Sequence, residues 1–531
     1  MIKPFDVRRE RFIPSSDLSG VVHEYSVADC LTQAHKILEL ACSSPLETVA
    51  LLRLLLAILY QAFEDVTTDE DWRDLWNAPS LPKDKIEAYL NRQDGMDLFG
   101  EKPFMQIPKL EMKAFVPLSA LATEAAVGNN ATLFDHRSDV APQAYTPSEA
   151  ARMLIASQSF ALGFGRAAEA RVDGKAWPRP YLADAIALRG VCIFLTGGSL
   201  KETLLLNMPL RSNPNKKDVP AWELPDPTTT LDTLSKDGKR ISQPENGPVE
   251  RYAWLSRMIR LLPDDDGLVR RMYFTQGREA DKTPGDMMKA FVQSKKEGMF
   301  PLSLSASKAS WRDLHALLET EGKQKPAILH HVAHQVVEEC LDSKALYGLN
   351  IVGLATDPGK AGKFLLWRHD RVALPPALLA ENDDARTLRK YVELAIGEAE
   401  EIAGILGQRI YLVARRFLPP LDNPDPNDVR SLTSSIDPRV AYWARLETHF
   451  AVFLEGLRDI NSCEEALRVW QHGVEAEAER ALRESCRQLG ESGRAMRATA
   501  AIAYRFIADS NERARLAAEK PKRQAAKGAS K

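Results

Sequence analysis

The last third of the chain carries the pattern that most restricts its fold. From about residue 384, apolar residues return every three or four positions over a long stretch: Leu388, Val392, Ala395, Ala399, Ile402, Leu406, Ile410, Val413 and Phe417. This spacing aligns the apolar side chains along one face of an α-helix. Such helices must bury that face against other helices, so we expect the chain to end in a helical domain.

Two further helix starts are visible in this region. Asp437 followed by Pro438 is typical of an N-cap and the first helical turn, because the proline has no N–H to leave unsatisfied there. Ser462-x-x-Glu465 has the form of a capping box, in which each side chain accepts a hydrogen bond from a free backbone N–H.

A fourth helix is predicted over about 494–516. Four helices joined by short loops favour an antiparallel four-helix bundle, which we assign to residues 381–518. The residues after it, 519–531, are rich in lysine and predict a basic, flexible tail.

The preceding 380 residues predict a mixed α+β domain with irregular loops and small sheets. A nearly all-apolar segment in this part indicates a buried helix, and Ser148 is positioned to cap a later one. The clearest helices are expected over 27–42, 45–63 and 147–160, and two strands over 346–355 and 363–367. The fold class is therefore α+β, with a large domain over 1–380 followed by the bundle.

Composition excludes several classes of protein. The chain has 44% hydrophobic and 27% charged residues, which excludes wholesale disorder, and a net charge of −3, which argues against a coat of positive charge. Its six cysteines never lie within four residues of one another, so no zinc knuckle is expected. Neither a signal peptide nor a membrane-spanning stretch is predicted, and we expect a cytoplasmic protein.

Histidines offer the main catalytic alternative. His330 and His334 are one helical turn apart, and His369 with Asp370 forms the pair seen in metal phosphohydrolases. A metal-dependent phosphohydrolase using these four residues is one hypothesis; an interior helix and an ion-paired strand end are the structural alternatives. The chain contains neither a Walker loop nor a GxGxxG motif, and we expect no catalytic residues, cofactor or metal.

Two glycine-containing segments suggest contact with nucleic acid instead. Gly163-Phe164-Gly165-Arg166 follows a predicted helix, and glycines allow the main chain to approach a surface closely while arginine contacts phosphate. The alternative is a glycine cap at the end of that helix. Gly359, Lys360 and Ala361 lie between two predicted strands and Lys363 begins the second, so that they form either a hairpin tip that enters a groove or a solvated turn.

Several short sequence segments, taken in their order along the chain, resemble the CasA family, the large subunit of the type I-E CRISPR surveillance complex Cascade. The resemblance extends to about residue 515. It rests on these segments: Phe5-Asp6-Val7, Arg11-Phe12-Ile13-Pro14, Ala50–Leu59, Asp97-Leu98-Phe99, Pro103-Phe104-Met105-Gln106, Gly128-Asn129-Asn130, Phe134, Glu149–Gln158, Gly163-Phe164-Gly165, Leu200, Glu202–Asn207, Trp222-Glu223, Trp254, Arg257–Leu261, Trp311–Leu314 and Arg368-His369-Asp370.

The resemblance implies a non-catalytic role in antiviral defence. Such a subunit recognises the protospacer-adjacent motif (PAM) in double-stranded target DNA, helps to open the duplex for the guide RNA, and recruits a helicase-nuclease. The implied partners are the other Cascade subunits, the CRISPR guide RNA, target DNA and that helicase-nuclease, with no membrane. A backbone loop reading the minor groove would tolerate several motifs, because that groove presents a degenerate hydrogen-bond pattern.

The resemblance also implies the residues that contact DNA. The glycine loop is Gly163, Phe164, Gly165 and Arg166. The hairpin that wedges the duplex open carries Gly359, Lys360, Ala361 and Lys363. A first loop with Asn129, Asn130 and Phe134, and a groove lysine assigned to Lys282, complete the expected DNA contacts.

Overall fold

The computed structural model divides the chain into two compact units, Met1–Ala380 and Glu381–Lys531. Each unit is described by itself. The described residues are 3–122, 142–163, 165, 168–177, 181–211, 215–231, 233–234, 240–241, 244–279, 285–294, 298–302, 308–318, 323–356 and 364–500.

Helix α2 (Pro45–Ala62) forms the centre of unit one. Ser44 caps it by accepting a hydrogen bond from the N–H of Leu46, and Pro45 occupies its first turn. The helix is long and apolar enough to cross a membrane, but 78% of its apolar window is buried inside the protein. Burial on all sides is typical of a core helix, as the sequence predicts.

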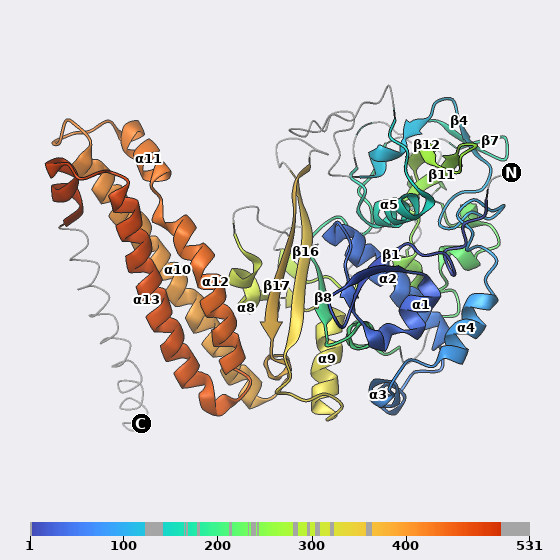
Figure 1. Cartoon of the computed structure of the whole chain (residues 1–531), viewed down its shortest axis with the longest axis horizontal. Coiled ribbons are helices and arrows are strands. Elements are labelled where there is room, and N and C mark those ends of the chain that lie inside the picture. The colour runs from blue at the N-terminus through green and yellow to red at the C-terminus, as the bar shows by residue number, and fades with distance from the viewer. Residues whose placement is uncertain are drawn as a thin grey trace. The chain divides into compact units, whose positions relative to one another are not determined.

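Helix α5 (Pro147–Phe160) packs against α2 and leads to the candidate site (Figure 1). Its bounds confirm the predicted helix, but its predicted cap is wrong. Thr146 caps α5 in a capping box with Glu149, while the Ser148 hydroxyl donates to the carbonyl of Arg11 at 2.9 Å. The capping box satisfies two free N–H groups at once, which a cap at Ser148 would not do.

The remaining helices of unit one are shorter and surround this core. They are α1 (Val27–Thr32), α3 (Asp69–Asn77), α4 (Lys83–Asn91), α6 (Leu200–Leu206), α7 (Pro248–Tyr252), α8 (Leu314–Leu318), α9 (Ala327–Val337) and the 3-10 turn η2 (Leu118–Leu121). The helix expected over 27–42 is wrong after Thr32. A 3-10 turn over Ala34–Lys36 and strand β3 (Ile37–Leu40) follow instead, and pairing of β3 with β1 (Ile13–Asp17) overrides the local helical pattern.

The described strands of unit one form small antiparallel sheets. Their orders are β2-β1-β3, β10-β9, β11-β12-β5, β14-β13-β15, β17-β16-β8 and β4-β6-β7. The bounds are β1 Ile13–Asp17, β2 Val22–Tyr25, β3 Ile37–Leu40, β4 Leu110–Met112, β5 Val116–Pro117, β6 Ala170–Val172, β7 Lys175–Trp177, β8 Cys192–Thr196, β9 Thr233–Leu234, β10 Arg240–Ile241, β11 Arg257–Pro263, β12 Val269–Gln276, β13 Phe291–Ser294, β14 Gly298–Pro301, β15 Lys323–Gln324, β16 Tyr347–Thr356 and β17 Phe364–Leu374.

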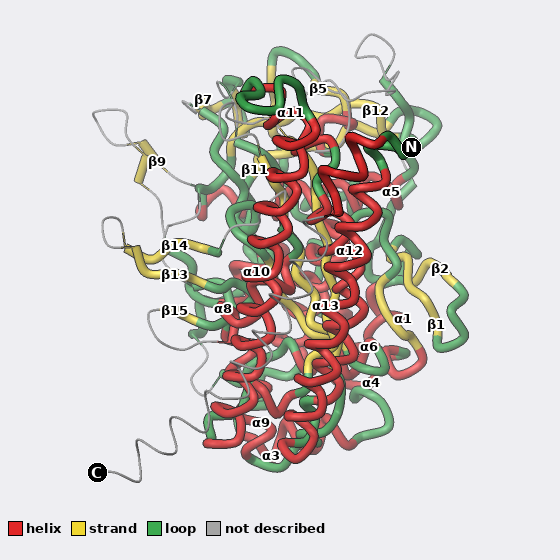
Figure 2. The backbone as a smooth tube through the Cα atoms, turned by 90° about the vertical axis from the view of Figure 1, so that its left-hand side faces the viewer, coloured by secondary structure: helices red, strands yellow, loops and turns green. Residues whose placement is uncertain are grey.

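The regular structure of unit two, as far as residue 500, is helical. Its elements are α10 (Asp383–Phe417), α11 (Pro426–Ser435), α12 (Pro438–Gly456) and α13 (Cys463–Arg487). Helices α10, α12 and α13 run side by side (Figure 2). Trp470 on α13 is 1% exposed, packs on Phe450 and Phe453 of α12, and donates its indole N–H to the carbonyl of Ala395 at 3.0 Å.

The structure corrects two details of the predicted helical region. The Asp437 cap is confirmed, but Ser462 makes no side-chain capping bond, and a 3-10 turn over Ile460–Ser462 precedes α13 instead. The short helix α11 was not predicted. The chain is again helical over 493–500, where the fourth helix is expected, and the rest of that helix and the basic tail lie outside the described residues.

Candidate nucleic-acid interface

A buried arginine supports the chain where α5 ends. Arg257 on β11 donates from Nη2 to the carbonyls of Ala161 and Leu162, at 3.1 and 3.0 Å. Gln158 on α5 fixes the same strand, because its side chain bonds both the N–H and the carbonyl of Arg257. The Arg257 side chain thus donates to the two carbonyls that follow the helix, and these hydrogen bonds fix the chain just before Gly163.

Gly163 is a packing glycine. Its N–H donates to Oδ1 of Asp184 at 2.9 Å. A Cβ at this position would lie 2.4 Å from the backbone N of Asp184 and 2.5 Å from the carbonyl carbon of Ala183. Only a residue without a side chain allows this close approach of two backbone segments.

Gly165 is different, because it lies at an exposed position of the loop. Its φ of +74° is in the left-handed region that favours glycine, and, its two chain neighbours aside, no heavy atom lies within 4 Å of where a Cβ would be. Its carbonyl accepts a hydrogen bond from Leu182 at 3.1 Å, which holds the loop on the segment that also contacts Gly163. The main chain at Gly165 is therefore open to a ligand.

The alternative of a glycine helix cap is wrong. The residue that ends α5 is Ala161, in an extended conformation, and neither glycine occupies the cap. Phe164 and Arg166 lie outside the described residues. The loop of Gly163 and Gly165 is thus a separate backbone turn held by Arg257 and Asp184, two supports that sequence reasoning missed because they lie far from it along the chain.

The second predicted segment joins two long strands. Strands β16 and β17 pair antiparallel from Tyr347–Leu374 to Thr356–Phe364, which confirms the predicted pair of strands. The predicted end of the second strand at 367 is wrong, because its pairing with β16 continues to Leu374. The connection over 357–363 lies outside the described residues, and with it the candidates Gly359, Lys360, Ala361 and Lys363.

The remaining DNA-contact candidates also fall on residues that the structure leaves undescribed. Asn129, Asn130 and Phe134 belong to 123–141, and Lys282 belongs to 280–284. The described residues on both sides of 280–284 are held by buried ion pairs. Arg278 pairs with Glu250 at 2.6 Å, and Asp286 pairs with Arg53 at 2.7 Å.

The four residues of the metal-hydrolase hypothesis do not come together. Nε2 of His334 lies 3.0 Å from the carboxylate of Asp69, whereas Nε2 of His369 lies 2.8 Å from Oδ1 of Asn350. Asp370 accepts hydrogen bonds from the Ser310 N–H and from Arg368. Among the described residues, which include all four candidates, no group of three or more His, Cys, Asp or Glu residues could hold a metal ion. The metal-site hypothesis for these residues is therefore wrong.

The neighbouring His331 also has a structural role. It is 6% exposed and its ring meets Trp72 edge to face at 5.2 Å. Burial lowers the pKa of His331 to about 4, so the ring is neutral near pH 7. The prediction of an interior helix is confirmed for the face of α9 that carries this histidine.

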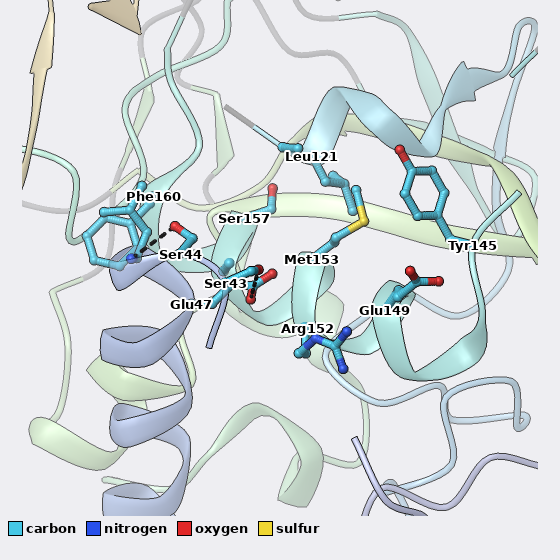
Figure 3. Close-up of a pocket in the computed structure, with 13 residues that line it drawn as sticks. Ser43, Ser44, Glu47, Leu121, Tyr145, Glu149, Arg152, Met153, Ser157 and Phe160 are labelled. Carbon is cyan, nitrogen blue, oxygen red and sulfur yellow. Dashed lines mark hydrogen bonds between the residues drawn. The ribbon is translucent and has the colours of Figure 1, made fainter. Parts of the chain in front are cut away.

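A pocket of about 180 Å³ lies beside α5, between the start of α2 and η2. Figure 3 shows Ser43, Ser44 and Phe160 on one side and Leu121 with Tyr145 on the other. The Arg152 side chain also lines the pocket, but its Nη1 donates to the Glu24 carboxylate and to the carbonyl of Phe12. Among the described lining residues, the Ser43 hydroxyl donates to the Glu47 carboxylate at 3.1 Å, and none is a histidine, cysteine or lysine.

Comparisons with known proteins agree with one another. A family model described as CRISPR-associated protein Cse1 matches residues 6–481. The CRISPR-associated protein CasA/Cse1 of Thermus thermophilus is 32% identical over 512 residues, covering 94% of this chain and 96% of that protein. The crystal structure of Thermus thermophilus CasA matches with a TM-score of 0.77 at 28% identity, covering 96% of this chain and 100% of that one.

A chain of a structure described as a CRISPR RNA-guided surveillance complex has the same fold. It matches with a TM-score of 0.70 and covers 95% of this chain and 99% of that one. At 19% identity this likeness shows the fold alone.

Proposed function

Because the chain belongs to the Cse1 family of CRISPR-associated proteins, we propose that it is the large subunit of a type I-E RNA-guided surveillance complex. The shared fold with a chain from such a complex supports this assignment. The proposed partners are the other subunits and their guide RNA. We propose that the subunit is not itself an enzyme and works in the cytoplasm.

Its proposed activity is recognition of the PAM in double-stranded target DNA. The observation that carries this proposal is an exposed backbone turn at Gly165 on a buried polar support. Because Gly165 has no side chain, its main chain can press into the narrow minor groove, where the hydrogen-bond pattern is degenerate and several sequences are accepted. Gly163, Phe164, Gly165 and Arg166 form this contact, with Arg166 on phosphate.

The connection between β16 and β17 is proposed to open the duplex. Two long paired strands can carry its residues, Gly359 to Lys363, away from the sheet. A wedge between base pairs costs a few kcal/mol of unstacking, which pairing with a guide RNA then offsets. Asn129, Asn130, Phe134 and Lys282 supply further contacts to the nucleic acid.

The two units have separate proposed roles. Residues 1–380 recognise the motif and dock on the complex, while residues 381–518 form a four-helix bundle and residues 519–531 a flexible basic tail. The helical turn over 493–500 supports a fourth helix of that bundle. The subunit also recruits the helicase-nuclease that degrades the target.

A selection with randomised duplexes tests the reading of the motif. The assembled complex is incubated with target duplexes whose flanking base pairs are random, and the bound fraction is sequenced. The wild type should enrich a set of flanks. Gly165→Asn should abolish that enrichment, because it adds a side chain at the contact while asparagine still tolerates a positive φ.

Gly490→Asn is the matched control. Gly490 has a φ of +78° and nothing within 4 Å of a Cβ, as at Gly165, but it follows α13 in unit two. This variant should retain the wild-type enrichment. If Gly165→Asn selects the same flanks as the wild type, the glycine loop does not read the motif and the proposal fails.

A further inference from the structure

A strip of two aromatic and two arginine side chains, two of them exposed and two half-buried, runs along the β11-β12-β5 sheet. It consists of Phe115, which directly precedes β5, Arg260 on β11, and Arg271 with Tyr273 on β12. Neither the proposed reading of the motif nor the candidate residues above use this strip. The sheet lies near β4 and β7 in unit one (Figure 1).

Strand register places the strip on one face of the sheet. Arg271 and Tyr273 are two residues apart on β12, and side chains at this spacing point to the same side. Arg260 is the cross-strand partner of Tyr273, so it shares that side. Tyr273 and Arg260 are half-buried, whereas Arg271 is exposed.

The aromatic rings already form a stack that is open to solvent. The rings of Phe115 and Tyr273 have centroids 5.6 Å apart and planes 19° apart. Cζ of Arg271 lies 5.5 Å from the centroid of Phe115. Phe115 is nevertheless 53% exposed, so part of this large apolar side chain is available to a further flat ring.

The two arginines leave positive charge on the strip. Among the described residues neither Arg260 nor Arg271 pairs with a carboxylate; Arg260 donates instead to the carbonyl of Leu110 at 3.2 Å. In the acidic turn that joins the strands, Asp264 pairs with Arg270 and not with either arginine of the strip. A ligand of the strip should therefore combine flat rings with negative charge.

The strip also lies close to the glycine loop. The loop is supported by Arg257 at the start of β11, three residues before Arg260, and the hydroxyl of Thr275 on β12 donates to the carbonyl of Ala168 at 2.8 Å. Three residues of strand span about 10 Å. The strip therefore begins about 10 Å along the strand from the residue that supports the loop.

We propose that Phe115, Arg260, Arg271 and Tyr273 form a binding platform for single-stranded nucleic acid. A base stacks on the exposed face of the aromatic pair, and the two guanidinium groups contact the phosphates. A duplex does not fit this role, because its base faces are already stacked on one another. If the proposed function holds, the strand freed by duplex opening is the nearest DNA source; the guide supplies the RNA alternative.

Binding of labelled oligonucleotides to the full chain tests the platform. Fluorescence anisotropy is measured with a 15-nucleotide oligodeoxythymidine, a 15-nucleotide oligouridine and a 15-base-pair duplex. Phe115→Ala should weaken single-strand binding by about 5- to 100-fold, the usual loss when one stacking ring is removed. Phe115→Trp should restore it, because tryptophan supplies an equivalent ring.

Two control variants separate stacking and charge from general effects. Tyr411→Ala removes an aromatic side chain that is 42% exposed on α10 and should leave binding unchanged. Arg271→Ala should reduce the slope of log Kobs against log salt by about 0.7 for a single strand, whereas Arg430→Ala, an exposed arginine on α11, should not.

Each outcome has a defined meaning. Tighter binding of oligodeoxythymidine supports a DNA strand as the ligand, and tighter binding of oligouridine supports the guide. Equal affinities of the wild type and Phe115→Ala, or binding of the duplex alone, would overturn the proposal. It would also be overturned if the wild type bound no single strand and Phe115→Ala caused the complex to lose a protein subunit, because the strip would then be a protein interface. The assay contains no flanking motif, so it does not depend on the selection at Gly165.

Discussion

Gly163 and Gly165 are two residues apart, yet the structure gives them opposite environments. The would-be Cβ of Gly163 points into backbone atoms of Ala183 and Asp184, while that of Gly165 points into open space. A large residue at either position would disturb the proposed DNA contact, but at Gly163 it would do so by displacing the loop. Gly165 is therefore the residue at which function can be tested without disturbing the packing beneath it.

The packing at Gly163 predicts a loss of stability. Gly163→Ala should lower the free energy of unfolding by about 1–3 kcal/mol, because backbone atoms cannot move away from the added methyl group cheaply. Urea denaturation measures the change. Gly397→Ala makes the same chemical change in the middle of α10, where nothing lies within 4 Å, and should stabilise by up to about 1 kcal/mol. Equal shifts for the two variants would contradict the close approach at Gly163.

At the scale of elements, a buried ion pair connects α2 to the segment before β13. Both side chains of Arg53 and Asp286 are 0% exposed, and their charged atoms are 2.7 Å apart. Burial alone would raise the pKa of the Asp286 carboxyl, but Arg53, Lys289 and Arg251 together hold that pKa well below its usual range. The carboxylate therefore stays ionised in the folded protein, and it helps to fix the described residues that follow 280–284.

Breaking this pair should be costly. Asp286→Asn leaves the Arg53 charge buried without its partner and should destabilise the protein by about 3–5 kcal/mol at pH 7. The contribution of Asp286 exists above its unfolded pKa of about 3.9 and is lost as the pH falls below it. The difference between the wild type and the variant in urea denaturation should therefore shrink below about pH 4.

The exposed pair of Lys102 with Asp94 provides the comparison. Their side chains are 44% and 75% exposed, so Asp94→Asn should change stability by less than about 1 kcal/mol. A cost at Asp286 no larger than at Asp94, or a difference that does not change with pH, would show that the buried pair does not stabilise the fold.

Helices with a local apolar pattern or a proline at their start could be predicted from the sequence. The contacts between residues far apart along the chain could not. The apolar pattern and Pro147 were sufficient to give α5 its bounds, and the two glycines that follow were visible as a motif. Arg53 in an all-apolar helix indicates a buried partner, but Asp286 lies 233 residues away among 73 acidic residues. Arg257 likewise contacts Leu162 across 95 residues. No spacing rule identifies such contacts, which only the folded chain brings together.

At the scale of the whole molecule, the division at 380/381 should appear in its unfolding. Each unit buries its own apolar core, and separate cores can open separately. Unit one is organised around α2, and unit two around the contacts of Trp470 with α10 and α12. A substitution inside one core is therefore expected to expose the amides of that unit first.

Trp470→Ala tests this independence. Removal of a tryptophan that is 1% exposed should cost about 3–5 kcal/mol, because it leaves a cavity among Phe450, Phe453 and Ala395. Hydrogen exchange measured by mass spectrometry should show faster exchange in peptides from α10, α12 and α13, with α2 unchanged. The reciprocal substitution Leu55→Ala, in α2, should accelerate exchange in unit one only. If either variant accelerated hydrogen exchange equally in both units, the chain would unfold as one cooperative body although it has two cores.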